Sequence, residues 1–337
     1  MIQTPRDAVL AALRHTQGPT VPYNLMLSPP AEDLLRRHYG VEDLQAELGL
    51  HLYLYGCRGK PLYAAPDRYG PTITDEFGVV WSTSHIDRGY PVSHPLTAPS
   101  LAGYDFPAAE DPGRWEGVAE ASARYPDQFR LAVIGDLWER AHFLRGLDGI
   151  LCDAVAEPDF AHELLGRICA YNLQTLDRLA AFSPDGVFIS DDYGFQDRLM
   201  VRPETWRAVV LPHLRVLLQA ARQRGLVTML HSCGNVADIV PDLIAEGLDI
   251  LHPIQPEAMD IARLKREYGR DITFCGGIST QKLLPFGTPQ QVRDEVRRTL
   301  EIMGQGGGYI AEPGITVQAD VPLGNLVALV ETLRGAA

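Results

Sequence analysis

The stretch "LVTMLHSCGNVADIVPDLIAEGLDILHPIQP", residues 226–256, contains a complete strand–helix–strand pattern. Its two apolar runs, 226–234 and 248–256, each end in polar, glycine or proline residues, and a segment with helical spacing separates them. Near-continuous apolar strands joined by helical crossovers are typical of a parallel sheet that is covered on both faces or closed into a barrel. The stretch therefore predicts one βαβ unit of such a sheet.

The same alternation extends over the rest of the chain. Residues 202–225 are expected to form one long helix that begins at Pro203 and stops at Gly225, and 260–269 and 288–304 repeat the format. No Gly-x-Gly-x-x-Gly follows an early strand, so the main sign of a dinucleotide-binding fold is missing. Eight strands in this length favour an α/β fold of the (β/α)₈ or TIM-barrel type. The expected strands are 20–27, 50–56, 130–136, 185–192, 226–234, 248–256, 271–277 and 307–314.

A long insertion, roughly residues 57–125, separates the second and third expected strands. Within it, "PTITDEFGVVWS" (71–82) predicts a hairpin, and helical spacing returns only at 113–125. Long loops often control substrate access, so we expect this insertion to cover the barrel mouth. No repeat or linker marks a second domain, which predicts a single domain over residues 1–337. Candidate aromatic lining residues, which are equally typical of a core, are Tyr55, Phe77, Trp81 and Trp138.

The amino-acid composition argues against several classes of protein. The net charge is −13 and the basic residues form no run, which argues against a nucleic-acid partner. No apolar run is long enough for a membrane span, and charges stand where a signal peptide would be apolar, so we expect a cytoplasmic protein. The five widely spaced cysteines predict no disulfide framework.

Soft metal ligands follow the expected strands, at the end of a (β/α)₈ barrel where active sites form. His231 and Cys233 are two residues apart on an extended chain and point the same way, and Cys275 ends another strand. A catalytic zinc prefers such thiolate and imidazole ligands and keeps one position open. Glu312 is a candidate displaceable fourth ligand, and His252 is a competing one. Cys275 and His252 are equally compatible with plain core filling.

Four polar residues form the candidate catalytic set. Asp191 and Asp192 end the strand 185–192 and are candidates for a general acid and base or for orienting a metal ligand. An aspartate pair before a glycine-containing turn also suits simple capping. His252 and Gln255, which follow the sixth strand, complete the set.

Four segments of the chain carry a resemblance to a known family. They are "DLWERAHFLRGLDGILCDAVAEPDFAHELLGRI" (136–168), "LHSCGNVADIVPDLIAEGLDILHPIQPEA" (230–258), "DITFCGGISTQKLLPFGTPQQVRDEVRR" (271–298) and "GGGYIAEPGITVQADVPLGNLVALVE" (306–331). Together they resemble the uroporphyrinogen decarboxylase superfamily, and more narrowly its branch that includes cobalamin-dependent methyltransferases. The resemblance implies a (β/α)₈ barrel. True decarboxylases of this kind carry an arginine-rich N-terminal motif and a substrate-gathering aspartate, whereas "VPYNLMLSPPAEDLL" (21–35) lacks arginine and "LHLYLYGCRGKPL" (50–62) lacks aspartate. Porphyrinogen decarboxylation is therefore not expected.

The methyltransferase branch is similar in having a His-x-Cys pair and a distant cysteine that bind zinc, and His231 and Cys233 match the pair. In the coenzyme M methyltransferases of the branch the distant cysteine lies near the last strand, where this chain has "AEPGI" with Glu312. The resemblance thus leaves Cys275 or Glu312 to complete the site.

The activity that the resemblance implies is zinc-dependent methyl transfer, in either direction, between a small molecule of thiol, methoxy or methylamine type and a corrinoid. The chain has no Asp-x-His-x-x-Gly motif, so methylcobalamin or cob(I)alamin is expected to arrive on a partner protein. Related barrels imply a homodimer. Two alternatives stay open: a uroporphyrinogen decarboxylase-like lyase that acts on a small carboxylate with Asp191 or Asp192, and a ligand-binding barrel without catalysis.

Overall fold

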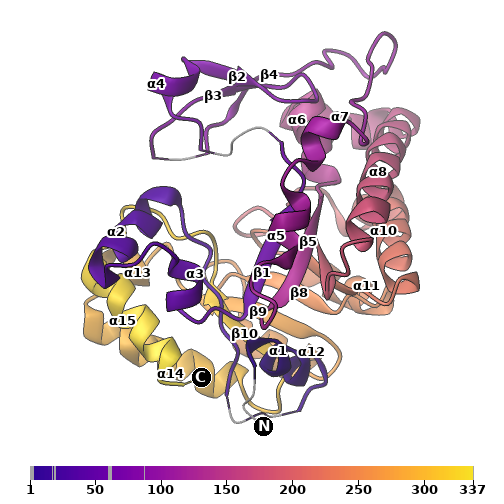
Figure 1. Ribbon diagram of the computed structural model, residues 1–337. Helices are drawn as coiled ribbons and strands as arrows, with labels where there is room; N and C mark the ends of the chain where they lie inside the picture. Colours follow the sequence, from indigo (N-terminus) through magenta and orange to yellow (C-terminus); the bar gives the residue numbers. More distant parts are fainter. Residues whose placement is uncertain (1–3, 17, 19, 60–62, 87, 337) are drawn as a thin grey trace. The chain divides into compact units, whose positions relative to one another are not determined.

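The computed structural model in Figure 1 describes residues 4–16, 18, 20–59, 63–86 and 88–336. The chain divides into two compact units, each described by itself below. The first unit comprises the described residues of 1–53, 125–130 and 231–337, and the second those of 54–124 and 131–230. Within the described part of the chain, no helix has the length and apolar character that crossing a membrane would require.

Among the described residues, the main sheet has seven strands whose order follows their order along the chain. The pairs β5–β6, β8–β9 and β9–β10 are parallel. Helices connect the successive strands from β5 onward, which confirms the predicted α/β class and its repeated β–α unit. The strands are β1 (Leu52–Gly56), β5 (Phe129–Gly135), β6 (Gly186–Ser190), β7 (Val227–His231), β8 (Ile250–Ile254), β9 (Thr273–Ile278) and β10 (Tyr309–Pro313).

The first predicted strand, 20–27, is wrong as a regular strand. It makes isolated parallel bridges, from Tyr23 to Ala311 and from Leu27 to Val317. Pro22 has no N–H to donate, so a continuous ladder cannot form there. On its other side, the Tyr23 carbonyl accepts the His51 N–H at 3.1 Å. The segment nevertheless occupies the eighth position, between β10 and the residue that precedes β1, as a (β/α)₈ barrel requires.

Helices of the first unit begin at recognisable caps. Thr4 and Thr288 each form a capping box with the residue three positions later, and the Asp260 carboxylate accepts the Arg263 N–H. The last two helices pack against each other, as the yellow end of the chain in Figure 1 shows. The helices are α1 (Pro5–Leu13), α2 (Pro29–Tyr39), α3 (Leu44–Glu47), η2 (Ala237–Ile239), α11 (Val240–Ala245), α12 (Ile261–Tyr268), α13 (Leu283–Phe286), α14 (Pro289–Met303) and α15 (Leu323–Arg334).

One predicted helix of the second unit is wrong. The single helix expected over 202–225 is two helices, α9 (Pro203–Val209) and α10 (Leu211–Gln223). Pro212 cannot donate the backbone hydrogen bond that would continue α9, so a new helix begins there. The other helices are α5 (Val118–Ala123), α6 (Trp138–Arg145), α7 (Leu147–Ala156) and α8 (Pro158–Ala180).

The insertion contains the predicted hairpin. Strands β2 (Thr72–Thr74) and β3 (Val80–Ser82) pair antiparallel, and β4 (Pro91–Ser93) joins β3. Two short helices flank this sheet, α4 (Pro66–Tyr69) and η1 (Pro112–Trp115). Residues 60–62 and 87, which belong to the predicted insertion, lie outside the described residues.

Candidate functional site

In the first unit, the predicted soft ligands form one continuous series of contacts. His231 is the last residue of β7, and its Nε2 lies 3.3 Å from the Cys233 sulfur. Its other ring nitrogen, Nδ1, lies 3.0 Å from His252 Nδ1. One side of the His231 ring therefore faces the thiol and the other faces the second imidazole. The His-x-Cys pair that the sequence singled out is brought together with His252.

The series continues through His252 to the end of β10. His252 Nε2 lies 3.5 Å from Glu312 Oε2, and the Cys275 thiol donates to the same oxygen at 3.0 Å. Asn24 Nδ2 donates to the other carboxylate oxygen at 2.9 Å, which fixes the carboxylate plane. The donor atoms of His252, Cys275 and Glu312 all lie within 4.8 Å of one another. The structure thus groups Cys275 and Glu312 with His252.

Burial shifts these three groups toward their uncharged forms. The exposed fractions of His252, Cys275 and Glu312 are 1%, 0% and 1%. Burial, and then the nearby His231, hold the pKa of His252 well below its usual range. Burial, and then the Glu312 charge, raise the pKa of the Cys275 thiol. Burial raises the pKa of Glu312 to about 7, although its hydrogen bonds from Cys275 and Asn24 oppose that shift.

The pair His231–Cys233 and the group His252, Cys275 and Glu312 each offer donor types that suit a zinc ion. Imidazole nitrogen, thiolate sulfur and carboxylate oxygen are the ligands that zinc takes in proteins, and nitrogen and sulfur on one tetrahedral zinc stand about 3.5 Å apart. The separation between His231 Nε2 and Cys233 Sγ agrees with that spacing. A bound cation would also offset the cost that desolvation adds to the thiolate form of Cys275 and the carboxylate form of Glu312.

Backbone geometry lets β9 approach β8 closely at this cluster. Gly276, directly after Cys275, has φ +123°, and a Cβ there would meet the Ile254 nitrogen at 2.7 Å. Only glycine tolerates both conditions. Gln255, which follows β8 and is buried, accepts the Gly234 N–H with its side-chain oxygen at 3.1 Å. The predicted catalytic Gln255 therefore holds the turn that carries Cys233.

In the second unit, Asp191 caps a helix from a neighbouring strand. Its carboxylate accepts the N–H groups of Trp138 at 3.0 Å and Glu139 at 2.6 Å, which begin α6. The Asp192 N–H adds a weaker contact at 3.3 Å. Burial raises the pKa of Asp191 to about 7, although the two helix N–H bonds oppose the shift. Of the three interpretations that the sequence left open for Asp191, the geometry agrees with capping, here of helix α6.

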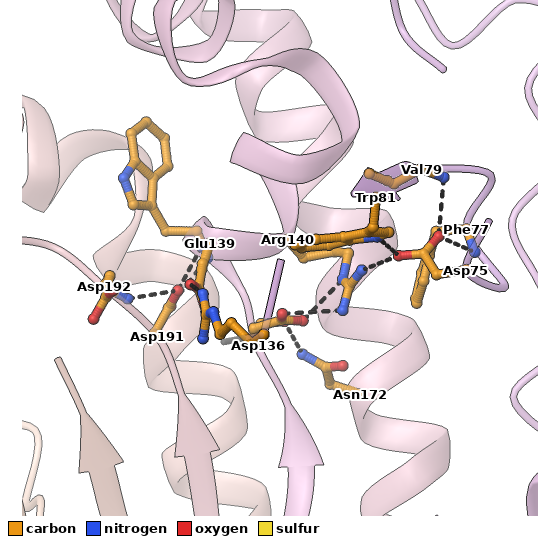
Figure 2. A network of polar contacts seen from close by, with 12 residues as sticks. Asp75, Phe77, Val79, Trp81, Asp136, Glu139, Arg140, Asn172, Asp191 and Asp192 are labelled. Atoms are coloured by element: carbon orange, nitrogen blue, oxygen red, sulfur yellow. Dashed lines mark hydrogen bonds and ion pairs between the residues drawn. The ribbon is translucent and has the colours of Figure 1, made fainter. Parts of the chain in front are cut away.

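A buried charge network lies beside this cap (Figure 2). Arg140 stands between Asp136 and Asp75, with Nε–Oδ1 and Nη2–Oδ2 distances of 2.9 and 3.0 Å to Asp136 and an Nη1–Oδ2 distance of 3.2 Å to Asp75. Asn172 Nδ2 donates to the Asp136 carbonyl at 2.7 Å. Gly135, at φ +123°, leaves room for this contact, because a Cβ there would lie 2.6 Å from the Asn172 oxygen. The network ties the end of β5 to the insertion.

Glu139 lines a cavity of about 390 Å³ in this unit, together with residues of the insertion and the end of β5. Arg88 Nη2 donates to Glu139 Oε1 at 2.9 Å. Burial, and then the nearby charge of Asp192, raise the pKa of Glu139 to about 8. Trp81, a predicted lining aromatic, is part of the wall.

The sequence reasoning missed Asp136, Glu139 and Arg140. One signal was available for Asp136, because it ends the predicted strand 130–136 in the same way that Asp191 and Asp192 end 185–192. Glu139 and Arg140 lie on a helix, where charged residues carry no such signal.

Comparisons with known proteins agree with this fold. A methylated-thiol–coenzyme M methyltransferase of Methanosarcina mazei is 24% identical over 294 residues, which cover 86% of this chain and 71% of that protein. Methylcobamide:CoM methyltransferase MtaA of Methanosarcina barkeri is 28% identical over 146 residues, 43% of this chain and 40% of the relative. A uroporphyrinogen decarboxylase of Carboxydothermus hydrogenoformans is 24% identical over 177 residues, 52% and 48% of the two chains. The matches to the last two thus span less than half of each relative.

A solved structure described as a methyltransferase from Methanosarcina mazei has a TM-score of 0.76 to this chain at 20% identity, over 98% of both chains, which shows a shared fold. The family model for uroporphyrinogen decarboxylase (URO-D) matches residues 107–336. That match covers more than half of the sequence and includes most of the residues described above. The chain belongs to the uroporphyrinogen decarboxylase family.

Proposed function

We propose that this protein is a zinc-dependent methyltransferase that moves a methyl group between a small molecule, of thiol, methoxy or methylamine type, and a corrinoid carried on a separate protein. The observation that carries the proposal is the series of soft donors from Cys233 through His231, His252 and Glu312 to Cys275. The names of two relatives, which specify a methylated thiol and a methylcobamide, support the same reaction class.

His231 and Cys233 would hold the zinc, and Cys275 or Glu312 would complete the set, with His252 as the competing ligand. When bound, zinc supplies a Lewis acid that favours the thiolate of a substrate thiol at neutral pH or polarises a methylated oxygen or nitrogen, while methylcobalamin or cob(I)alamin from the partner supplies the cobalt.

The chain's own residues orient these donors. Asn24 fixes the Glu312 carboxylate, and Gln255 fixes the turn of Cys233 through the Gly234 N–H. Outer hydrogen bonds of this kind set the direction of a ligand's lone pairs and typically change metal affinity by about 10- to 100-fold when removed. We therefore assign Gln255 a positioning role.

The test measures methyl transfer from methylcobalamin to a panel of thiols by the zinc-loaded protein. The absorbance change of the corrinoid reports the transfer. We expect turnover that His231→Ala and Cys233→Ser both abolish. Cys152→Ser, at an exposed position of α7, is the matched control and should retain full activity. Unchanged turnover in His231→Ala would refute the proposal.

A second candidate is a uroporphyrinogen decarboxylase-like lyase that acts on a small carboxylate with Asp191 or Asp192. The pKa of Asp191, raised by burial to about 7, suits a general acid or base. This activity would release CO₂ or eliminate a group without any corrinoid, and Asp191→Asn or Asp192→Asn would abolish it. Corrinoid-dependent turnover that survives both substitutions would exclude the lyase reaction as the main activity.

For the chain as a whole, we propose one barrel domain over residues 1–337 and a cytoplasmic homodimer. The coverage of the structural match supports the single domain. Light scattering of the purified protein measures the oligomeric state.

A further inference from the structure

Two histidines face each other between α8 and α10 of the second unit, two helices that pack side by side (Figure 1). His162 lies in the second turn of α8, and His213 lies in the first turn of α10. The His213 ring lies against Gly166, one turn after His162, where a Cβ would contact the ring carbon Cε1 at 3.6 Å. Because both rings extend from regular helices, the scaffold fixes the separation between them.

The facing ring nitrogens have the separation of two ligands on one metal ion. His162 Nδ1 lies 3.2 Å from His213 Nε2, and the two rings are tilted by 50° with their centroids 5.4 Å apart. Metal–nitrogen bonds of about 2.0–2.1 Å place two nitrogens about 3.4 Å apart at a tetrahedral angle and about 2.9 Å apart at a right angle. The observed separation lies between these two values.

In the absence of a metal, the same contact is a hydrogen bond in which one neutral ring donates its proton to the other. Burial, and then the nearby His162, lower the pKa of His213, which favours the neutral ring that metals bind. The outward nitrogens, His162 Nε2 and His213 Nδ1, have no hydrogen-bond partner among the residues that the structure describes. The shared proton can therefore move to the outward nitrogen of its own ring, so a metal can take both facing lone pairs without net proton release.

Water would complete the coordination of such a metal. Among the described residues, no third histidine, cysteine, aspartate or glutamate shares a possible metal position with the two rings. The thiol of Cys169 donates instead to the His213 carbonyl at 3.5 Å, and burial raises the pKa of that thiol to about 11. Both imidazoles are only partly buried, so water reaches them. Two protein ligands and several waters are typical of a metal that exchanges readily.

We propose that His162 and His213 form a metal site in the second unit, which binds an exchangeable divalent transition-metal ion of the Zn²⁺, Ni²⁺ and Cu²⁺ class. Imidazole nitrogen suits these ions, whereas Mg²⁺ and Ca²⁺ prefer oxygen ligands. The site shares no residue with the soft donors of the first unit. It goes beyond the methyl-transfer proposal and does not rest on it.

The experiment is isothermal titration calorimetry at about pH 7 with the full chain, free of any affinity tag, after zinc loading and removal of loosely bound metal. The titrant is Ni²⁺, and Mg²⁺ is the negative control. We expect saturable binding of about one Ni²⁺ per chain and no binding of Mg²⁺. A parent protein that binds no Ni²⁺ would overturn the proposal and leave the contact between the rings as a hydrogen bond.

Two variants assign the bound metal to the pair. His162→Gln and His213→Gln should each weaken Ni²⁺ binding at least about tenfold, because the second imidazole binds a metal that the first already holds. His38→Gln, which removes a single exposed histidine of α2, is the matched control and should leave binding unchanged. Circular dichroism verifies the folding of each variant.

The size of the loss separates a shared site from two independent ligands. Losses of only about twofold in each variant would indicate two imidazoles that bind metal separately, and would refute the shared site. Binding that persists unchanged in both variants would place the Ni²⁺ elsewhere and refute it as well. Since each comparison is between a variant and the parent, the zinc content of the first unit does not alter these outcomes.

Discussion

The thiol–imidazole cluster of the first unit and the carboxylate–guanidinium network of the second unit are both buried and polar, yet they meet the cost of burial differently. In the first, Cys275, His252 and Glu312 are shifted toward their uncharged forms. In the second, Arg140 forms ion pairs with Asp136 and Asp75. The first cluster can therefore accept a metal by losing protons, whereas the second already holds oppositely charged partners and chiefly stabilises the fold.

The largest expected effect on stability comes from a variant that breaks the Arg140 network. Arg140→Met removes the partner of two buried carboxylates and should lower the free energy of unfolding by about 3–5 kcal/mol. Urea denaturation followed by circular dichroism measures this loss. Arg36→Met, which breaks a partly exposed pair with Glu32, is the control and should cost less than about 1 kcal/mol. Similar losses in the two variants would show that the Arg140 network does not stabilise the fold.

The next effect is a dependence of the free energy of unfolding on pH. The folded-state pKa of Glu139, about 8, lies above its ordinary value of 4.5, so the native state binds the extra proton between those values. Stability from this group is present at low pH and is lost as the pH rises toward 8, with a slope of about 1.4 kcal/mol per pH unit. Glu139→Gln should remove that slope between about pH 5 and 8.

Denaturation midpoints collected across this pH range test the expectation. Asp191 and Glu312, with pKa values of about 7, contribute in the same direction, so the difference between the parent protein and Glu139→Gln isolates Glu139. A slope that is identical in the parent protein and Glu139→Gln would contradict the assignment.

Local patterns predicted the fold, while individual prolines and, at the second cluster, long-range contacts account for what was missed. The β–α alternation follows from apolar spacing within each segment, but Pro22 interrupts the first strand and Pro212 divides the long helix. The first cluster could be predicted because rare ligand types, such as His231 and Cys233, stand at strand ends. The second could not, because its network joins helix α6 to an insertion without regular periodicity.

A smaller expected effect is a difference in alkylation rate between the cysteines of the first unit in metal-free protein. Cys233 is half-buried, whereas Cys275 is fully buried and its thiol pKa is raised by burial and by Glu312. Alkylation by iodoacetamide, read by peptide mass spectrometry, should modify Cys233 at least about tenfold faster than Cys275. Zinc should protect Cys233, while exposed Cys152 should react alike with and without zinc. Equal rates at Cys233 and Cys275 would contradict the burial of the cluster.

The most direct test of the metal site is elemental analysis for zinc of the purified parent protein and of Cys233→Ser, Cys275→Ser and the control Cys152→Ser. The account predicts about one zinc per chain in the parent and the control, and none in the other two variants. Zinc lost only with Cys233 would identify Glu312 or His252 as the third ligand. Zinc absent from the parent protein, or retained in both the Cys233 and Cys275 variants, would contradict the metal site and with it the proposed methyl transfer.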